Sequence, residues 1–178
     1  MLRDIWTLAS RPKAFFGALA EQNSNLPRSL MAAVLSMGIG TAIFLLAFTR
    51  MTASNAYAPI FALGIPAGLF LWLILWFIGG LIIIRPSGLD TRAWELTAWA
   101  WTVAGLVALS LLLVAIYLPF IAILLGLLAA TIWHLLLLNT ALKSFGSKNI
   151  FQTLLAYAFS VFVLPWLMFI VFYLIVNR

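Results

Sequence analysis

Side chains that could exchange protons or bind a metal are few in this sequence: one histidine, four carboxylates and no cysteine among 178 residues. His134 lies about two-thirds of the way along a long apolar stretch, where an ionisable group is a candidate for function. A proton relay would need a second such group at the same depth, and Glu95 lies near the end of its own apolar stretch. Thr131, Asn139 or a tyrosine could instead supply a hydrogen-bond partner. The sequence therefore favours a histidine that is hydrogen-bonded to a neighbouring helix.

Catalysis finds little support in the remaining residues. Hydrolytic or metal chemistry needs a nucleophile beside a base, or a cluster of histidine, cysteine and carboxylate ligands at suitable spacing. A chain with one histidine and no cysteine cannot build such a cluster, and the P-loop, Rossmann and H-E-x-x-H patterns are absent. We expect a protein that is not an enzyme and that holds no cofactor and no metal.

The composition indicates a bilayer as the surroundings of the chain. Hydrophobic residues make up 66% and charged residues 8%, whereas a soluble domain has about 25% charged residues. Residues 69–84 are apolar on every face, which is typical of a spanning helix and not of an alternating barrel strand. The predicted fold is an all-α, polytopic transmembrane bundle.

About five spans account for the apolar residues. Pro119 divides an apolar run of about 50 residues, which is too long for one span. Pro66 and Pro165 predict kinks in the second and fifth spans, and Gly64 with Gly68 forms a G-x-x-x-G pair that could allow close helix packing. The predicted spans are 29–48, 59–84, 93–118, 120–142 and 150–176. The chain thus divides into a cytoplasmic amphipathic segment, 1–28, and a five-helix transmembrane domain, 29–178.

The N-terminal segment predicts two short amphipathic helices on either side of Pro12. Apolar residues recur at helical spacing in both halves. Four basic residues of this segment could contact anionic lipid headgroups or a partner protein: Arg3, Arg11, Lys13 and Arg28. In the alternative interpretation, the two helices pack against the protein's own loops.

The basic residues also predict the orientation. In the five-span arrangement, eight Lys and Arg residues fall on the side of the N-terminus, and only Arg50 and Arg178 fall on the other. Because basic loops stay in the cytoplasm, we expect a cytoplasmic N-terminus and an external C-terminus. The formal charge of +6 then reflects topology and does not indicate a nucleic-acid partner.

The run Arg11-Pro12-Lys13-Ala14-Phe15-Phe16 ahead of the first span is similar to the opening of prokaryotic members of the Yip (Ypt-interacting protein) membrane family. A charged loop with Gly88, the pair Ile132-Trp133 and the turn at residues 145–149 also resemble that family. The resemblance implies five helices, no catalytic activity and a bacterial cell (inner) membrane. The GTPase association of eukaryotic relatives is not carried over, because their long N-terminal region is lacking here.

Two functions follow as expectations. The first is a membrane scaffold or interaction protein with a membrane-protein partner or a second copy of itself. The alternative is a small transporter or channel subunit whose pathway passes His134 and the kinks at Pro66 and Pro165.

Overall fold

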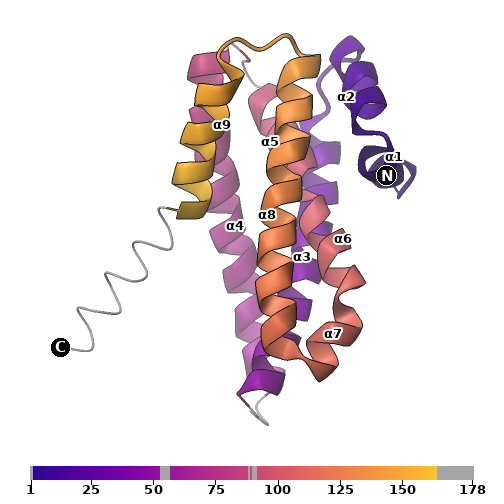
Figure 1. Cartoon of the computed structure of the whole chain (residues 1–178), viewed down its shortest axis with the longest axis vertical. Helices are drawn as coiled ribbons and strands as arrows, with labels where there is room; N and C mark the ends of the chain where they lie inside the picture. Colours follow the sequence, from indigo (N-terminus) through magenta and orange to yellow (C-terminus); the bar gives the residue numbers. More distant parts are fainter. Residues whose placement is uncertain (1, 53–56, 88, 90–91, 164–178) are drawn as a thin grey trace, which may run out of the picture.

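The structure is a computed structural model that describes residues 2–52, 57–87, 89 and 92–163. Within these residues the chain forms helices and no strand, which confirms the all-α class (Figure 1). The helices are α1 Leu2–Ser10, α2 Pro12–Glu21, α3 Leu26–Met51, α4 Tyr57–Ser87, α5 Arg92–Trp101, α6 Val103–Ser110, α7 Leu112–Tyr117, α8 Pro119–Ser144 and α9 Ile150–Ala158, followed by the π-helical turn Phe159–Val163. Pro165 and Arg178, which entered the predictions above, lie outside the described residues.

Among the described residues, three helices are long and apolar enough to cross a membrane: α3, α4 and α8. Each contains at least 26 residues, or about 39 Å of helix, against a hydrocarbon core of about 30 Å. α3 begins before the predicted span 29–48, because Asn25 caps it there: the Asn25 side chain accepts a hydrogen bond from the Arg28 backbone N–H at 3.2 Å. α4 continues as one helix through Pro66.

The predicted span 93–118 is not one continuous helix but three short ones in series, α5, α6 and α7, beside α8 (Figure 1). The first break lies at Thr102, where Ser36 of α3 intervenes. Ser36 Oγ donates to the Thr102 carbonyl at 2.5 Å and accepts from the Gly105 N–H at 2.8 Å. A side chain from α3 thus satisfies backbone groups that the interrupted helix leaves free.

The second break, at Leu111, is bridged within the segment itself. The Leu111 N–H is shared between the carbonyls of Val107 and Ala108, at 3.2 and 3.1 Å. Ser110 Oγ also donates back to the Val107 carbonyl at 2.7 Å, a bond that commonly bends helices. Both breaks therefore coincide with hydroxyl side chains that compete for backbone groups.

The predicted break at Pro119 is confirmed. α7 ends at Tyr117, and Leu118 leaves the helical conformation with φ −133° and ψ 63°. A residue before proline is disfavoured in the helical region, whereas proline itself suits the first turn of α8. The chain reverses here, and α7 packs against α8.

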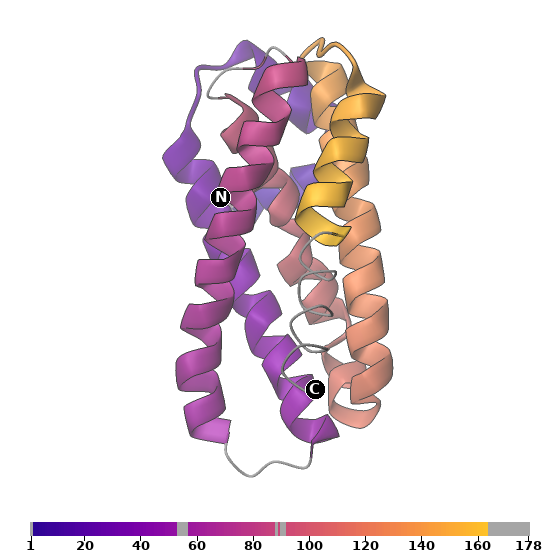
Figure 2. The same cartoon turned by 90° about the vertical axis from the view of Figure 1, so that its left-hand side faces the viewer.

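Glycines let α4 approach its neighbours closely. A Cβ atom at Gly64 would lie 2.7 Å from Leu45 Cδ1, and one at Gly68 would lie 2.7 Å from Thr41 Cγ2. Both neighbours belong to α3, so the G-x-x-x-G pair lies where α4 packs closely against α3. Farther along α4, Gly79 and Gly80 meet α9 and α5 in the same way, and α9 lies beside α4 and α8 (Figure 2).

The N-terminal helices α1 and α2 form as predicted and pack against the bundle. Leu8, Phe16 and Leu19 are buried in the same core as residues of α3, α4 and α5. The Phe15 ring meets the Trp99 ring edge-on, with centroids 4.9 Å apart. The structure thus shows these helices packed on the protein itself, while Trp6 remains 73% exposed.

Replacing Gly105 with alanine should destabilise the bundle, because the new Cβ would lie 2.5 Å from the backbone oxygen of Ser36. We expect a loss of about 1–3 kcal/mol, as in other overpacked interiors. Gly38→Ala is the matched control: nothing lies within 4 Å of its Cβ position, and alanine favours helix by about 0.5–1 kcal/mol. Thermal unfolding in detergent, followed by tryptophan fluorescence, measures both; equal midpoints would contradict the close contact of α3 and α6.

Candidate functional site

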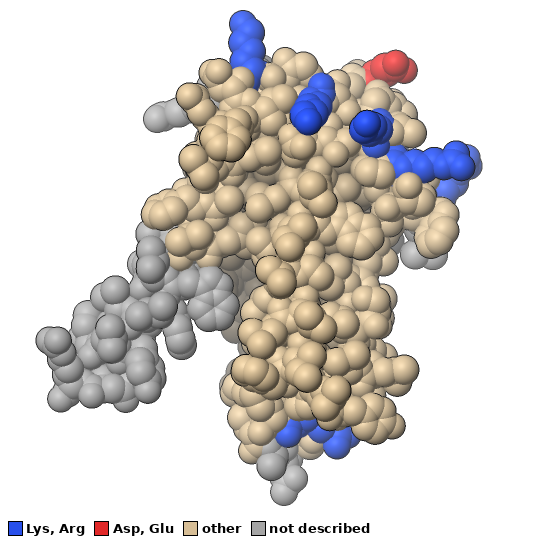
Figure 3. All heavy atoms as spheres, viewed as in Figure 1, with Lys and Arg blue, Asp and Glu red and all other residues tan. Residues whose placement is uncertain are grey.

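Basic side chains gather at one end of the bundle (Figure 3). This is the end at which α3 and α5 begin, α8 ends and the N-terminal helices pack. Arg50 lies in the last turn of α3, at the opposite end. All four residues that we predicted to contact lipid or a partner are exposed at this end: Arg3, Arg11, Lys13 and Arg28.

Arg28 is also tied to the N-terminal helix α1. Its Nη2 lies 2.5 Å from Asp4 Oδ2, in an ion pair on the surface. Burial alone would raise the pKa of Asp4, but hydrogen bonds and positive charges nearby, those of Arg28 among them, hold this pKa below its ordinary value. The pair therefore links α1 to the first turn of α3.

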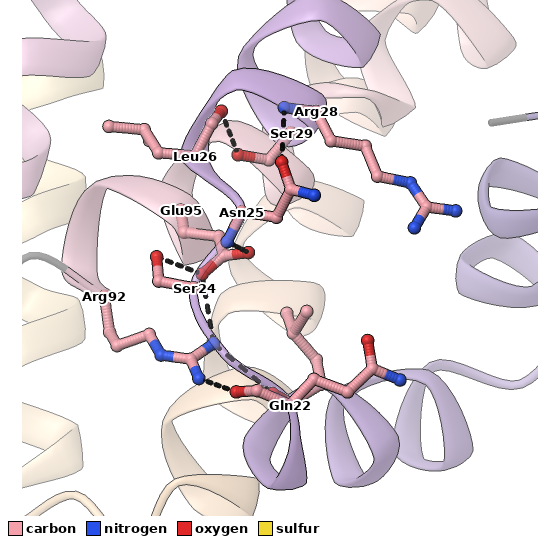
Figure 4. Close-up of polar contacts among 9 residues, drawn as sticks. Gln22, Ser24, Asn25, Leu26, Arg28, Ser29, Arg92 and Glu95 are labelled. Carbon is pink, nitrogen blue, oxygen red and sulfur yellow. Dashed lines mark hydrogen bonds and ion pairs between the residues drawn. The ribbon is translucent and has the colours of Figure 1, made fainter.

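A buried carboxylate lies beneath this basic surface. Glu95, in the first turn of α5, is 0% exposed. Its Oε2 accepts hydrogen bonds from Ser24 Oγ at 2.9 Å and Arg92 Nη1 at 3.1 Å, and its Oε1 accepts from the Asn25 backbone N–H at 3.0 Å (Figure 4). Both oxygens are thus engaged, so the arrangement holds the α2–α3 connection and does not present a free base.

Arg92 completes this cluster by capping α2. It donates to the carbonyl of Leu19 at 3.3 Å and to that of Gln22, at the end of α2, and its guanidinium lies 5.6 Å from the ring centroid of Phe145 after α8. A cation suits the negative end of a helix, and an anion suits the positive end. The Arg92–Glu95 pair lies between the end of α2 and the start of α3. The Arg92 cation is therefore at the negative end of α2, and the Glu95 anion is at the positive end of α3.

From the sequence, Glu95 was considered only as a possible proton-relay group near the end of an apolar stretch, and this cluster was not predicted. Arg92 and Glu95 stand three residues apart, a spacing at which helical side chains can pair. This spacing is the one local sign in the sequence that Arg92 and Glu95 could form an ion pair. The bonds to residues 19–25 join positions some 70 residues apart in the chain, which local patterns do not reveal.

His134 forms a separate, buried polar pair. Its Nε2 lies 2.8 Å from the hydroxyl oxygen of Tyr157 on α9, as expected for a histidine bonded to a neighbouring helix through a tyrosine. The rings of Trp101 and Phe162 pack around it, with centroids 4.6 and 5.6 Å away. His134 is 2% exposed, and the basic residues named above lie at the end of the bundle and not beside it.

Two buried indole nitrogens, those of Trp72 and Trp99, have no hydrogen-bond partner among the described residues. Such groups are uncommon in protein interiors. No cluster of three or more His, Cys, Asp or Glu side chains that could hold a metal occurs within the ranges described. These buried nitrogens therefore do not belong to a metal site among the described residues.

Two hollows adjoin at Thr140, between α2 and α8. The polar one, of about 330 Å³, is lined by Lys13, Asn139, Thr140, Lys143 and Ser144. The apolar one, of about 390 Å³, is lined by Pro12, Ala129, Ile132, Trp133, Leu136, Leu137 and Thr140. Lys13, one of the four predicted contact residues, thus lines a hollow.

Comparisons of this chain with protein-family models, with curated proteins and with solved structures find no match.

Replacing Glu95 with glutamine should loosen the N-terminal helices, because an amide N–H₂ would face donors and Arg92 would lose its counter-charge. Breaking a buried pair costs about 3–5 kcal/mol, and the partial exposure of Arg92 lowers our expectation to roughly 2–4 kcal/mol. Tryptic cleavage after Lys13 in detergent should become faster, and the unfolding midpoint should fall.

Glu21→Gln is the control, since Glu21 is an exposed acid at the end of α2 and removing its charge breaks no ion pair described above. If both variants were cleaved at the wild-type rate, the ion pair would not hold the N-terminal helices.

Proposed function

We propose that this chain is a non-enzymatic integral membrane protein of the Yip type that acts as a scaffold or interaction partner within the membrane. One observation carries the proposal: the buried charges are engaged in joining helices, while large apolar side chains face outward. Glu95 and Arg92 hold the α2–α3 connection to α5. Exposed apolar residues follow α4 and α8, including Leu63, Phe70, Phe77, Leu124, Leu128 and Leu136. Such surfaces suit lipid and partner helices, and a membrane-protein partner or a second copy of the chain would bind there.

The proposal includes five spans in the cell (inner) membrane, with a cytoplasmic N-terminus and an external C-terminus. In it, α5, α6 and α7 together make the third crossing, and the chain from Ile150 onward makes the fifth. The series α5–α7 follows α8 along its length (Figure 1), and the basic residues at one end agree with the cytoplasmic side.

Cysteine labelling tests this topology, and the natural chain contains no cysteine, so each substitution introduces a single thiol. Ser10→Cys and Ser147→Cys should react only from the cytoplasmic side, whereas Thr52→Cys and Leu118→Cys should react from outside. Leu118→Cys is decisive for the broken segment: labelling from the cytoplasmic side would mean that α5–α7 does not cross. Asn177→Cys, beyond the described residues, should label from outside if the fifth crossing exists.

The alternative, a transporter with a pathway near His134, is opposed by the packing of that residue. The His134 ring stacks on the Tyr157 ring at 5.4 Å and is covered by Trp101 and Phe162. Neither hollow described above is lined by His134. A scaffold explains a packed histidine more simply than a conducting path does.

The two functions differ in what purified protein should do. A scaffold should run in mild detergent above its monomer mass of 19.7 kDa or with a stoichiometric partner, and should pass no protons or solutes in liposomes. A transporter should show flux that His134→Phe removes and that Tyr117→Phe, at an exposed site on α7, preserves. Flux with this pattern would overturn the scaffold proposal.

A further inference from the structure

The adjoining hollows between α2 and α8 differ sharply in chemistry. Lys13 from α2 and Lys143 from the last turn of α8 line the polar hollow, and none of its lining residues is acidic. Both lysines are exposed, so their ammonium groups need not lose their hydration to be held there. Two cations from different helices at one concave site favour a ligand with a compact negative charge, such as a phosphate.

The other polar groups of this hollow complement that charge. Thr140 Oγ1 donates to the Leu136 carbonyl at 2.8 Å, and Ser144 Oγ donates to the Thr140 carbonyl at 3.0 Å. Their hydroxyl hydrogens are therefore engaged, and their oxygens remain as acceptors. Donors must come from Lys13, Lys143 and the amide of Asn139, an arrangement that suits a phosphate ester carrying hydroxyl groups.

The apolar hollow continues from Thr140 down α8 toward the middle of the bundle. Ala129, Ile132, Trp133 and Leu136 line it, and the last three are 51%, 37% and 58% exposed. From residue 140 back to residue 129 the helix rises roughly 16 Å, about half of a hydrocarbon core of about 30 Å. The apolar hollow thus has about the length of one leaflet, and it begins at Thr140, next to the polar hollow that Lys13 and Lys143 line.

We infer that this surface is a binding site for a single anionic glycerophospholipid, with the phosphate between Lys13 and Lys143 and one acyl chain against Trp133 and Leu136. The inference rests on the proposed membrane-spanning bundle, which would place the basic end of α8 at the headgroups. It assigns Lys13 a specific role, apart from the general attraction of a basic surface to an anionic leaflet.

Native mass spectrometry in detergent tests this site with phosphatidylglycerol and phosphatidylcholine as probes. We expect one tightly held phosphatidylglycerol for each chain. Because a lysine near an anionic headgroup contributes roughly fivefold in affinity, two should favour phosphatidylglycerol over phosphatidylcholine by about 25-fold. The double variant Lys13→Gln/Lys143→Gln should remove most of this preference.

A matched control separates the site from bulk charge. Arg50→Gln/Lys148→Gln loses the same two charges from exposed positions that do not line the hollow, and it should bind as the wild type does. For the acyl chain, Ala129→Trp fills the apolar hollow and should weaken binding at least fivefold. Leu128→Trp, an exposed neighbour outside the lining, should not.

Equal binding of the two lipids, or equal losses in each variant and its control, would overturn the site. Displacement of phosphatidylglycerol by millimolar inorganic phosphate would show an anion site without an acyl chain, and dimers in place of lipid adducts would assign the surface to a second copy; each overturns the proposal. Cysteine labelling distinguishes failure of the lipid-site proposal from failure of the proposed topology. If the labelling pattern shows five spans but the protein has no lipid preference, only the lipid site is rejected.

Discussion

The ion pair of Arg92 and Glu95 is the interaction on which the basic end of the structure depends. A fully buried carboxylate is tolerated only when nearby charge and hydrogen bonds replace its hydration. Glu95 obtains these from Arg92, Ser24 and the Asn25 backbone, and Arg92 in turn satisfies carbonyls at the end of α2. Because these groups come from α2, α3 and α5, the N-terminal helices are held to the bundle in one position.

A second constraint acts within the apolar part of the bundle, where backbone groups must be paired inside the protein. The break at Thr102 meets this requirement through Ser36, and the break at Leu111 does so through shared carbonyls and Ser110. Small residues make the first solution possible, since Gly105 lets α3 come close enough for Ser36 to reach both backbone groups. Irregular backbone is thus confined to places where a neighbour or a hydroxyl supplies the missing bond.

These two constraints are the reason that our functional proposals concern the surface of the bundle. Inside it, Ser36 and the His134–Tyr157 pair join helices to one another. What faces outward is a basic end and a broad apolar surface, and the two meet in the concave region between α2 and α8. The proposed recognition of lipids or of other membrane helices rests on this surface, because it combines basic side chains at one end with apolar side chains along the helices.

The sequence by itself determined the helical class, the α7–α8 turn, the two N-terminal helices and the gathering of basic residues at one end. Length of apolar runs, proline and charge are local signals, so no tertiary contact is needed to interpret them. The sequence narrowed the partner of His134 to a short set of residues that included a tyrosine, but it did not identify that tyrosine as Tyr157. Only the tertiary structure decided that the run 93–118 is broken twice, that Glu95 is buried and hydrogen-bonded by Ser24, Asn25 and Arg92, and that Lys13 and Lys143 line one hollow. Each of these depends on a residue far away in the chain, because a side chain from another helix supplies the bond, the counter-charge or the opposite wall.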